Sequence, residues 1–240
     1  MSLLILLQAL SSDSANTVFQ KANAAYEKGR YEEARTKYET LVEAGWVSTE
    51  LYYNLGNTYF KLKKNGLAIL FYEKTLKLDS RQEDAWANLE LARLRRRDTM
   101  IIPPDFFVFA LLRGLRDYFS VSTWAWLSLI GWYLLIGLLV LPRMGWWVSP
   151  NWVRRGVAVA FLLLSVCFFS KWAHESNQQE AVILSSVADA RNEPLEASSV
   201  VFVLHEGTKV QIRSEREDWL EIVLPDGKVG WVRHTDAGKI

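Results

Sequence analysis

The strongest constraint on this chain is an uncharged apolar run from Val121 to Leu141. A helix rises about 1.5 Å per residue, so this run would cross the roughly 30 Å hydrocarbon core of a bilayer. A second run, Gly156–Ser170, is shorter and spans a bilayer only when the helix is extended to Ala173. The sequence therefore predicts two membrane helices, 121–141 and 156–173, with a buried hairpin of a soluble domain as the alternative.

Charge and tryptophan are distributed unevenly along the 240 residues. Residues 121–174 carry four basic and no acidic side chains and seven of the eleven tryptophans, whereas residues 175–240 carry seven basic and twelve acidic side chains. Tryptophans near the ends of apolar runs are typical of membrane interfaces. Neither run contains Asp, Glu, Lys, Arg or His, so we expect anchoring rather than ion transport. The overall balance of 28 basic to 27 acidic residues disfavours nucleic-acid binding.

The loop at 142–155 between the two runs holds three arginines and no acid. Short basic loops tend to stay in the cytoplasm, which places both flanking parts on the opposite side of the membrane. The apolar stretch Leu3–Leu10, followed by a cleavage-like Ala9-Leu10-Ser11, favours export as well, so residues 1–14 are predicted as a signal-like or disordered start. Arginines before the first run weigh against this topology.

The first hundred residues contain a repeat with a period of 34. Such a period indicates a stack of helical hairpins rather than unrelated ones, each burying its apolar face against the next. We assign residues 15–98 to this stack, with a last helix, Glu83–Arg97, covering its end. The matched pairs are Phe19 and Tyr53, Ala22 and Gly56, Ala25 and Tyr59, Ala34 and Ala68, Tyr38 and Tyr72, and Val42 and Leu76.

The second copy resembles the tetratricopeptide repeat. The run YYNLGNTY at 52–59, followed by Ala68 and Tyr72, matches the pattern of that family, although Ser80 stands where proline is usual. The resemblance implies a scaffold that binds protein partners in a concave groove lined by the first helix of each hairpin. The alternative is that polar side chains on these helices only hydrogen-bond to neighbouring turns. The predicted groove residues are Asn23, Asn54, Asn57, Lys61 and Asn88.

Asn23 and Asn54 occupy positions at which clamp-type members of that family hold the C-terminal carboxylate of a partner. The basic residues that complete such a clamp are not matched, because Phe19 and Asn88 occupy two of their places. The sequence therefore favours a general protein-binding groove over a carboxylate clamp.

A linker at 99–120 connects the repeat to the first apolar run. Arg93 and Arg95–Arg97 precede it at a predicted helix end, where the macrodipole favours cations; contact with anionic lipid or an acidic partner is the alternative. Pro103-Pro104 prevents the helix that precedes the linker from continuing through it. Asp105–Phe119 is then predicted to form an amphipathic helix at the membrane interface.

After a short linker at 174–180, residues 181–240 are predicted to be all-β. Asp226-Gly227 is typical of a hairpin turn, because glycine accepts the positive φ that the turn requires. Five or so strands in about 60 residues predict a small barrel. The predicted strands are 181–184, 200–204, 209–213, 219–224 and 230–232.

This segment resembles a bacterial SH3-like domain in the runs HEGTKV at 205–210, DWLEI at 218–222 and DGKVGWV at 226–232. Trp219 and Trp231 are the predicted ligand-binding face, with packing of one of them inside as the alternative. The resemblance allows peptidoglycan as a ligand, whereas the net negative charge disfavours anionic polymers such as teichoic acids.

Motifs that carry catalysis are missing from the sequence, among them glycine-rich phosphate loops, GxSxG, HExxH and CxxC. The single cysteine, Cys167, excludes a disulfide within the chain and a multi-thiolate metal site. We therefore expect neither an enzyme nor a bound metal or cofactor.

The chain is thus predicted to be multidomain: an α-helical tetratricopeptide-repeat solenoid, a two-helix transmembrane hairpin and a small all-β SH3-like barrel. This order is similar to that of the BatE-type proteins of the Bacteroides aerotolerance (Bat) family. The resemblance implies a multi-pass protein of the bacterial inner membrane with periplasmic domains. It also implies a complex with von Willebrand A-type Bat proteins and a MoxR-type ATPase system, linked to oxidative-stress tolerance. The alternative is a cell-envelope sensor that binds peptidoglycan through the barrel.

Overall fold

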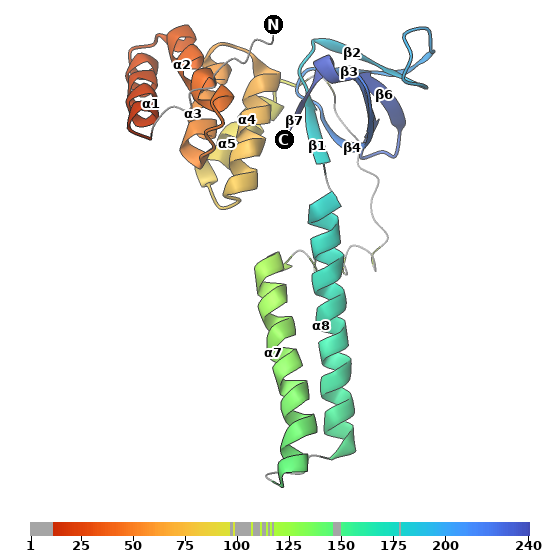
Figure 1. Ribbon diagram of the computed structural model, residues 1–240. Coiled ribbons are helices and arrows are strands. Elements are labelled where there is room, and N and C mark those ends of the chain that lie inside the picture. The colour runs from red at the N-terminus through yellow and green to blue at the C-terminus, as the bar shows by residue number, and fades with distance from the viewer. Residues whose placement is uncertain are drawn as a thin grey trace, which may run out of the picture. The chain divides into compact units, whose positions relative to one another are not determined.

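A computed structural model describes residues 12–96, 98, 107, 111, 114, 116, 118–145, 150–177 and 179–240. The chain divides into two compact units (Figure 1). One unit joins the N-terminal helices to the C-terminal sheet, and the other contains the two long apolar helices. The signal-like start up to Ser11, Arg97 and most of the predicted interfacial helix lie outside the described residues.

Five helices form the stack of hairpins. This stack is one part of the first unit, and we call it the repeat domain (residues 12–98). The turn of the first hairpin has Gly29 at φ +71°, and the turn of the second has Lys63 at φ +61°, one repeat later. Ser48 caps the third helix, because its Oγ accepts a hydrogen bond from the backbone N–H of Leu51 at 3.1 Å. The helices are α1 (Ser12–Glu27), α2 (Tyr31–Glu43), α3 (Thr49–Lys61), α4 (Asn65–Leu78) and α5 (Glu83–Arg93).

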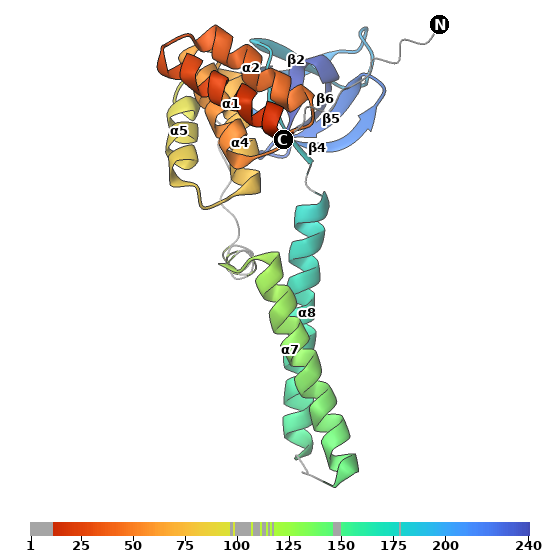
Figure 2. The same cartoon turned by 60° about the vertical axis from the view of Figure 1, so that its left-hand side comes forward.

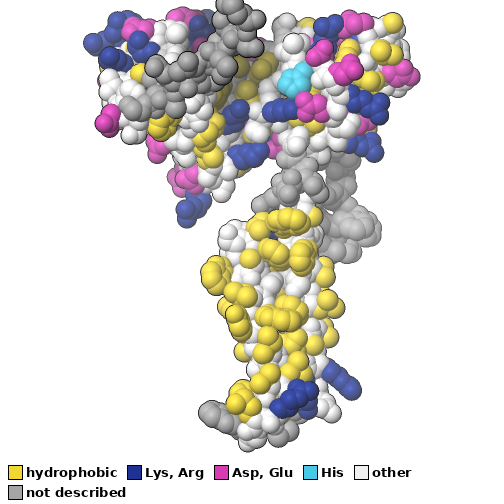
Figure 3. Space-filling model, in the orientation of Figure 1, with side chains coloured by type: hydrophobic (Ala, Val, Ile, Leu, Met, Phe, Trp, Pro, Cys, Tyr) yellow, Lys and Arg dark blue, Asp and Glu magenta, His cyan; other side chains and the backbone are white. Residues whose placement is uncertain are grey.

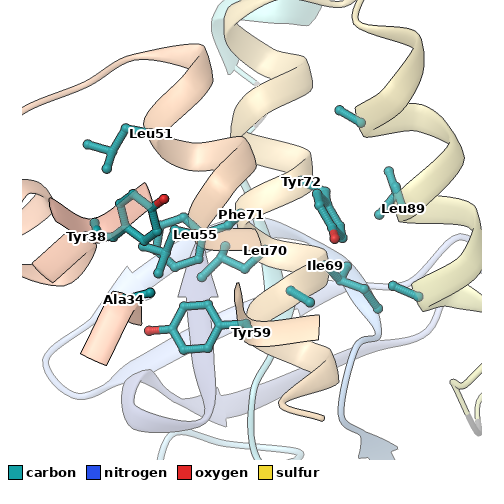
Figure 4. Close-up of a cluster of buried hydrophobic side chains, with 14 of the residues drawn as sticks. Ala34, Tyr38, Leu51, Leu55, Tyr59, Ile69, Leu70, Phe71, Tyr72 and Leu89 are labelled. Carbon is teal, nitrogen blue, oxygen red and sulfur yellow. The ribbon is translucent and has the colours of Figure 1, made fainter. Parts of the chain in front are cut away.

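Small residues at the predicted positions allow these helices to approach closely. Ala22, Ala34 and Ala68 are fully buried, and a Cβ added to Gly56 would lie 2.8 Å from the ring of Tyr72. Aromatic and aliphatic side chains of successive helices fill the space between them (Figure 4). The tight spacing explains why the repeat shows in the sequence: each hairpin requires small and aromatic residues at the same places.

The C-terminal part, which we call the β domain (residues 179–240), is one antiparallel sheet of seven strands in the order β3-β2-β6-β5-β4-β1-β7. Its strands are β1 (Gln179–Ile183), β2 (Val187–Arg191), β3 (Val200–His205), β4 (Lys209–Arg216), β5 (Trp219–Val223), β6 (Val229–Arg233) and β7 (Ala237–Lys239). The predicted turn is present, with Gly227 at φ +86°. The strands β2 and β7 were not predicted from the sequence, because the buried positions of VADAR are alanines, which have low β propensity, and AGK has only three residues.

The repeat domain and the β domain share buried apolar surface. Val182 of β1 belongs to the helical core, and Leu184 and Ile240 pack against it. The edge strand β7 is covered by α4, since a Cβ on Gly238 would lie 2.6 Å from Leu70. Figure 1 shows β1 and β7 beside α4, and in Figure 2 the C-terminus, which directly follows β7, lies next to α4. The two sequence-separated domains therefore pack as one body.

The second unit is an antiparallel pair of helices, α7 (Val121–Val140) and α8 (Asn151–Asn177), with a 3₁₀ turn at Leu141–Met144. Residues Val121–Met144 and Asn151–Ala173 are long and apolar enough to cross a membrane, and only 11% and 6% of their most apolar windows are buried. Hydrophobic side chains cover the visible face of the pair (Figure 3). Such exposure argues against a buried hairpin of a soluble domain. The helix α8 begins at Asn151, before the apolar run on which its prediction was based.

Candidate functional site

A hydrogen-bond network joins the first three helices of the repeat domain. The Oδ1 atom of Asn23 on α1 accepts a hydrogen bond from the hydroxyl of Tyr38 on α2 at 2.5 Å. The same oxygen accepts a second bond from Nδ2 of Asn54 on α3 at 3.2 Å. The network therefore connects the two helices of one hairpin to the first helix of the next.

The same network recurs one repeat later. Oδ1 of Asn57 accepts hydrogen bonds from the Tyr72 hydroxyl at 2.8 Å and from Nδ2 of Asn88 at 2.9 Å. Each of these three residues lies 34 positions after its counterpart in the first network. Nδ2 of Asn88 also donates to the hydroxyl of Tyr53 at 3.1 Å. Four of the five predicted groove residues thus form two equivalent pairs.

The tyrosines fix the direction of the asparagine amides. Burial raises the pKa of Tyr38 to about 12, and burial also raises the pKa of Tyr72, so both hydroxyls remain protonated at neutral pH. As donors they require the oxygen, not the nitrogen, of the Asn23 and Asn57 amides.

In the described part of the chain, each of the four asparagine amides uses only one of its two polar atoms in these networks. All four asparagines are partly exposed. Among the described residues, no bond engages Nδ2 of Asn23 and Asn57 or Oδ1 of Asn54 and Asn88. The asparagines do bond to neighbouring helices, as the structural alternative supposes, but they also present two donors and two acceptors at a spacing of one repeat.

Lys61, the fifth predicted groove residue, takes no part in either network. It is exposed at the C-terminal end of α3, next to the turn that contains Lys63 and Lys64. Phe19 packs edge-on against the ring of Tyr38, with ring centroids 5.9 Å apart. The described networks hold no cation for a partner's carboxylate.

The two tryptophans of the β domain lie on the outer side of the sheet. Their neighbours Leu220 and Val232 are fully buried in the core, and side chains alternate along a strand. Trp231 is nevertheless only 9% exposed, with the guanidinium of Arg216 5.7 Å from its ring centroid. Trp219 is more open and lies 5.8 Å from the Arg233 guanidinium.

Trp219 contributes to a pocket of about 240 Å³ on this outer side. The pocket combines one aromatic ring with two cations and three carboxylates, a lining suited to a ligand with both charges. Arg233 in its wall pairs with Glu196 through Nε at 2.6 Å. Of the seven lining residues, only Trp219 was predicted from the sequence, and three of the others lie on β2, which was not predicted. The lining residues are Val187, Asp189, Arg191, Glu196, Trp219, Arg233 and Asp236.

A second polar cluster lies where the repeat domain meets the β domain. The Asp98 carboxylate accepts hydrogen bonds from the His205 backbone N–H at 2.8 Å, its Nδ1 at 2.7 Å and the Thr208 hydroxyl at 2.7 Å. Burial opposes ionisation of Asp98, but these bonds outweigh it and hold the pKa below its usual value. Glu206 accepts a bond from the N–H of Gly66, at the first turn of α4, at 2.6 Å.

Glu73 of α4 is buried between two cations. Its carboxylate pairs with Arg93 at 2.7 Å and with Lys209 at 3.0 Å, and Lys209 also pairs with Glu180 at 2.8 Å. Burial lowers the pKa of Lys209, but the two carboxylates more than compensate and raise it. These charges tie α4 to β1 and β4, a contact that no periodicity in the sequence indicates.

The described residues contain no cluster of His, Cys, Asp or Glu with the arrangement of a metal site. Cys167 lies on α8 as a free thiol.

Family models match a segment of the repeat domain and most of the β domain. Residues 49–82 match the family model of the tetratricopeptide repeat, and residues 186–236 match that of the bacterial SH3 domain. No curated protein matches the chain. An NlpC/P60 family protein from Bacillus cereus ATCC 10987 is 20% identical over 30% of this chain and 23% of that chain, with a TM-score of 0.23.

The chain thus spans about a quarter of that protein's length. The tetratricopeptide repeat indicates interaction with proteins, and the bacterial SH3 domain suggests binding to the cell wall. The protein therefore combines a tetratricopeptide repeat, two helices long and apolar enough to span a membrane, and a bacterial SH3 domain.

Proposed function

We propose that this protein is a non-enzymatic, membrane-anchored scaffold that binds partner proteins through the asparagines of its repeat domain. The observation that carries the proposal is the duplicated tyrosine–asparagine–asparagine network, which leaves oriented amide atoms free one repeat apart. The matched repeat supports a role in protein interaction.

The free amide atoms suit an extended peptide segment of the partner. A peptide backbone offers both N–H donors and C=O acceptors. Nδ2 of Asn23 and Asn57 would bind its carbonyls, and Oδ1 of Asn54 and Asn88 would bind its N–H groups. Each such bond contributes only about 1 kcal/mol, so further side-chain contacts would determine which partner is chosen.

Our proposal for the identity of the partner proteins rests on the order of the domains. A repeat domain, two apolar helices and an SH3-like domain is the order of BatE-type proteins, so we propose partners of the Bat complex: von Willebrand A-type proteins and a MoxR-type ATPase system. The basic loop, with Arg143, Arg154 and Arg155, supports a cytoplasmic hairpin tip and periplasmic domains in the bacterial inner membrane.

The test compares two variants of the full chain in native membranes. Asn54→Ala/Asn88→Ala removes the free acceptors but keeps the bonds from Tyr38 and Tyr72 to Asn23 and Asn57. The control, Thr36→Ala/Arg81→Ala, changes exposed polar residues outside the networks.

Proteins crosslinked to each variant are quantified by mass spectrometry. The double asparagine variant should bind specific partners about thirtyfold more weakly, because two lost hydrogen bonds of about 1 kcal/mol each correspond to that factor, and the control should retain them. Equal capture by both variants would exclude the asparagine groove as the binding site.

A second candidate is a cell-envelope sensor that binds peptidoglycan through the β domain. The mixed-charge pocket around Trp219 favours it, because peptidoglycan peptides carry amino and carboxylate groups together. Detergent-solubilised full chain is incubated with purified sacculi, using Trp219→Ala against Trp46→Ala as control. If the chain binds the sacculi and only Trp219→Ala abolishes this binding, the sensor function is supported. If neither variant changes the binding, this pocket is excluded as the binding site.

A further inference from the structure

Five cations gather at one end of the repeat domain. They come from two segments: Lys61, Lys63 and Lys64 flank or form the turn between α3 and α4, and Arg95 and Arg96 follow α5. Two contacts bring these segments together. The Arg95 guanidinium lies 4.1 Å from the ring centroid of Phe60, and Nδ2 of Asn65 donates to the carbonyl of Ala92 at 3.0 Å. We call these five residues the basic patch.

The basic patch has no neutralising partners in the described part of the chain. None of its members forms an ion pair there, in contrast to Arg93 one turn earlier. Glu206, which lines a pocket together with Arg95, accepts a hydrogen bond from the N–H of Gly66, and Asp98 is bound by His205 and Thr208. The five cations are therefore available to an external anion.

Lys63 occupies a backbone position that disfavours it. Its φ of +61° is rare for residues with a Cβ, and the first hairpin has Gly29 at the same place with φ +71°. The four positions of that first turn, 27–30, hold Glu, Lys, Gly and Arg, whereas 61–64 hold Lys, Leu, Lys and Lys. The second turn thus concentrates positive charge, and it carries a lysine at position 63, where glycine would adopt the positive φ with less strain. Backbone strain that persists at an exposed residue points to a role for its side chain.

Apolar side chains accompany the charges. Leu94, directly before Arg95, is 81% exposed, and Leu91 one turn earlier on α5 is 52% exposed. Cations beside exposed aliphatic side chains are typical of surfaces that bind a membrane interface. In the sequence, the linker at 99–120 connects Asp98 to the apolar helix α7, which begins at Val121. The patch is therefore tethered to a membrane helix by a short segment of chain.

We propose that the basic patch binds the anionic phospholipid headgroups of the bilayer in which this protein is anchored. Its lysines and arginines contact the phosphates, and Leu91 and Leu94 enter the interfacial region. Each cation near an anionic membrane surface favours the bound state by about fivefold. Removing three charges should therefore shift the balance between bound and free by on the order of a hundredfold.

The experiment uses the full chain in nanodiscs. Cys167→Ala removes the natural thiol, and Leu91→Cys carries an NBD dye whose emission and dithionite accessibility report contact with lipid. Nanodiscs contain either phosphatidylcholine alone or an equal mixture with phosphatidylglycerol. We expect a blue shift and slower dithionite reduction only with phosphatidylglycerol, and both effects should fade at high salt.

Three variants distinguish lipid binding from a structural effect. Lys61→Gln/Lys63→Gln/Lys64→Gln should abolish the response to phosphatidylglycerol. The control Lys21→Gln/Lys28→Gln/Lys37→Gln removes the same charge from the first hairpin and should preserve it. Lys63→Gly should weaken the response while raising the melting temperature, which a merely structural lysine would not do.

An identical NBD signal in both lipid mixtures overturns the proposal, as does an equal loss in the patch and control variants. If the signal ignores phosphatidylglycerol but changes when an acidic protein is added, the patch is a protein-binding surface instead. None of these outcomes depends on Asn54 or Asn88, so failure here leaves the proposed groove function standing.

Discussion

The carboxylate of Asp98 accepts a hydrogen bond from the backbone N–H of His205 at 2.8 Å, although 107 positions of sequence separate the two residues. The intervening chain includes both apolar helices. This contact, with those of Glu73 and Glu206, makes the β domain a fixed part of the repeat domain rather than a tethered module.

Asp98→Asn should loosen the contact between the two domains. The amide loses the charge that strengthens three hydrogen bonds, and its NH₂ group is a donor that cannot replace a carboxylate oxygen as an acceptor. We expect a loss of about 1–3 kcal/mol of stability. Hydrogen exchange of the full chain should rise at β1, β7 and α4. Unchanged exchange at these elements would show that the contact contributes nothing to docking.

The contribution of Asp98 should depend on pH in one direction. Its pKa is lower in the folded protein than its ordinary value of 3.8, so its stabilisation is fully present above that value and is lost as pH falls through the folded pKa. The difference in melting temperature between the native chain and Asp98→Asn should be largest near neutral pH and shrink below about pH 4. A constant difference across this range contradicts the assignment.

Glu73→Gln should destabilise the junction from the side of the repeat domain. The glutamine leaves Arg93 and Lys209 partly buried without their shared carboxylate, although Glu90 and Glu180 still pair with them. We expect a cost of about 1–3 kcal/mol, measured as a lower midpoint of thermal unfolding. Glu33→Gln, which removes a carboxylate from exposed pairs on α2, is the matched control and should change little.

Gly56→Leu should separate α3 from α4. A Cβ at this position already lies within 2.9 Å of two ring atoms of Tyr72, whose hydroxyl holds Asn57. The overpacking should cost at least ~1–3 kcal/mol and should also abolish partner capture through the groove. Gly137→Leu on α7, where a Cβ meets nothing within 4 Å, provides the control. Unchanged melting of the repeat domain in Gly56→Leu would contradict the helix register.

Lys63→Gly should stabilise the repeat domain. Glycine adopts positive φ without the steric cost that lysine bears, as Gly29 does in the first hairpin. The gain should be about 0.5–1 kcal/mol, seen as a higher melting temperature of the full chain. Gly29→Lys is the reciprocal test and should lower it. A loss of stability in Lys63→Gly would mean that the lysine side chain makes a structural contact.

Local patterns explain how much of the fold the sequence could predict. A period of 34 requires small residues such as Gly56 and Ala68 wherever helices touch, so the hairpins are visible from spacing alone. The groove asparagines followed from the same register. Lys61 lies outside the networks because it is close to the end of α3, beyond the part of the helix that faces the next hairpin.

The sequence by itself determined the elements and their order: helical hairpins, two long apolar helices and an SH3-like sheet. These depend on periodicity, apolar length and turn residues, which act over a few neighbouring positions. Only the tertiary structure decided that Glu73 meets Lys209, that Asp98 meets His205, and that the end of α5 with Arg95 and Arg96 lies beside the lysines of the turn at 61–64. Such contacts join residues far apart in the chain, and each depends on side-chain packing that no local pattern specifies.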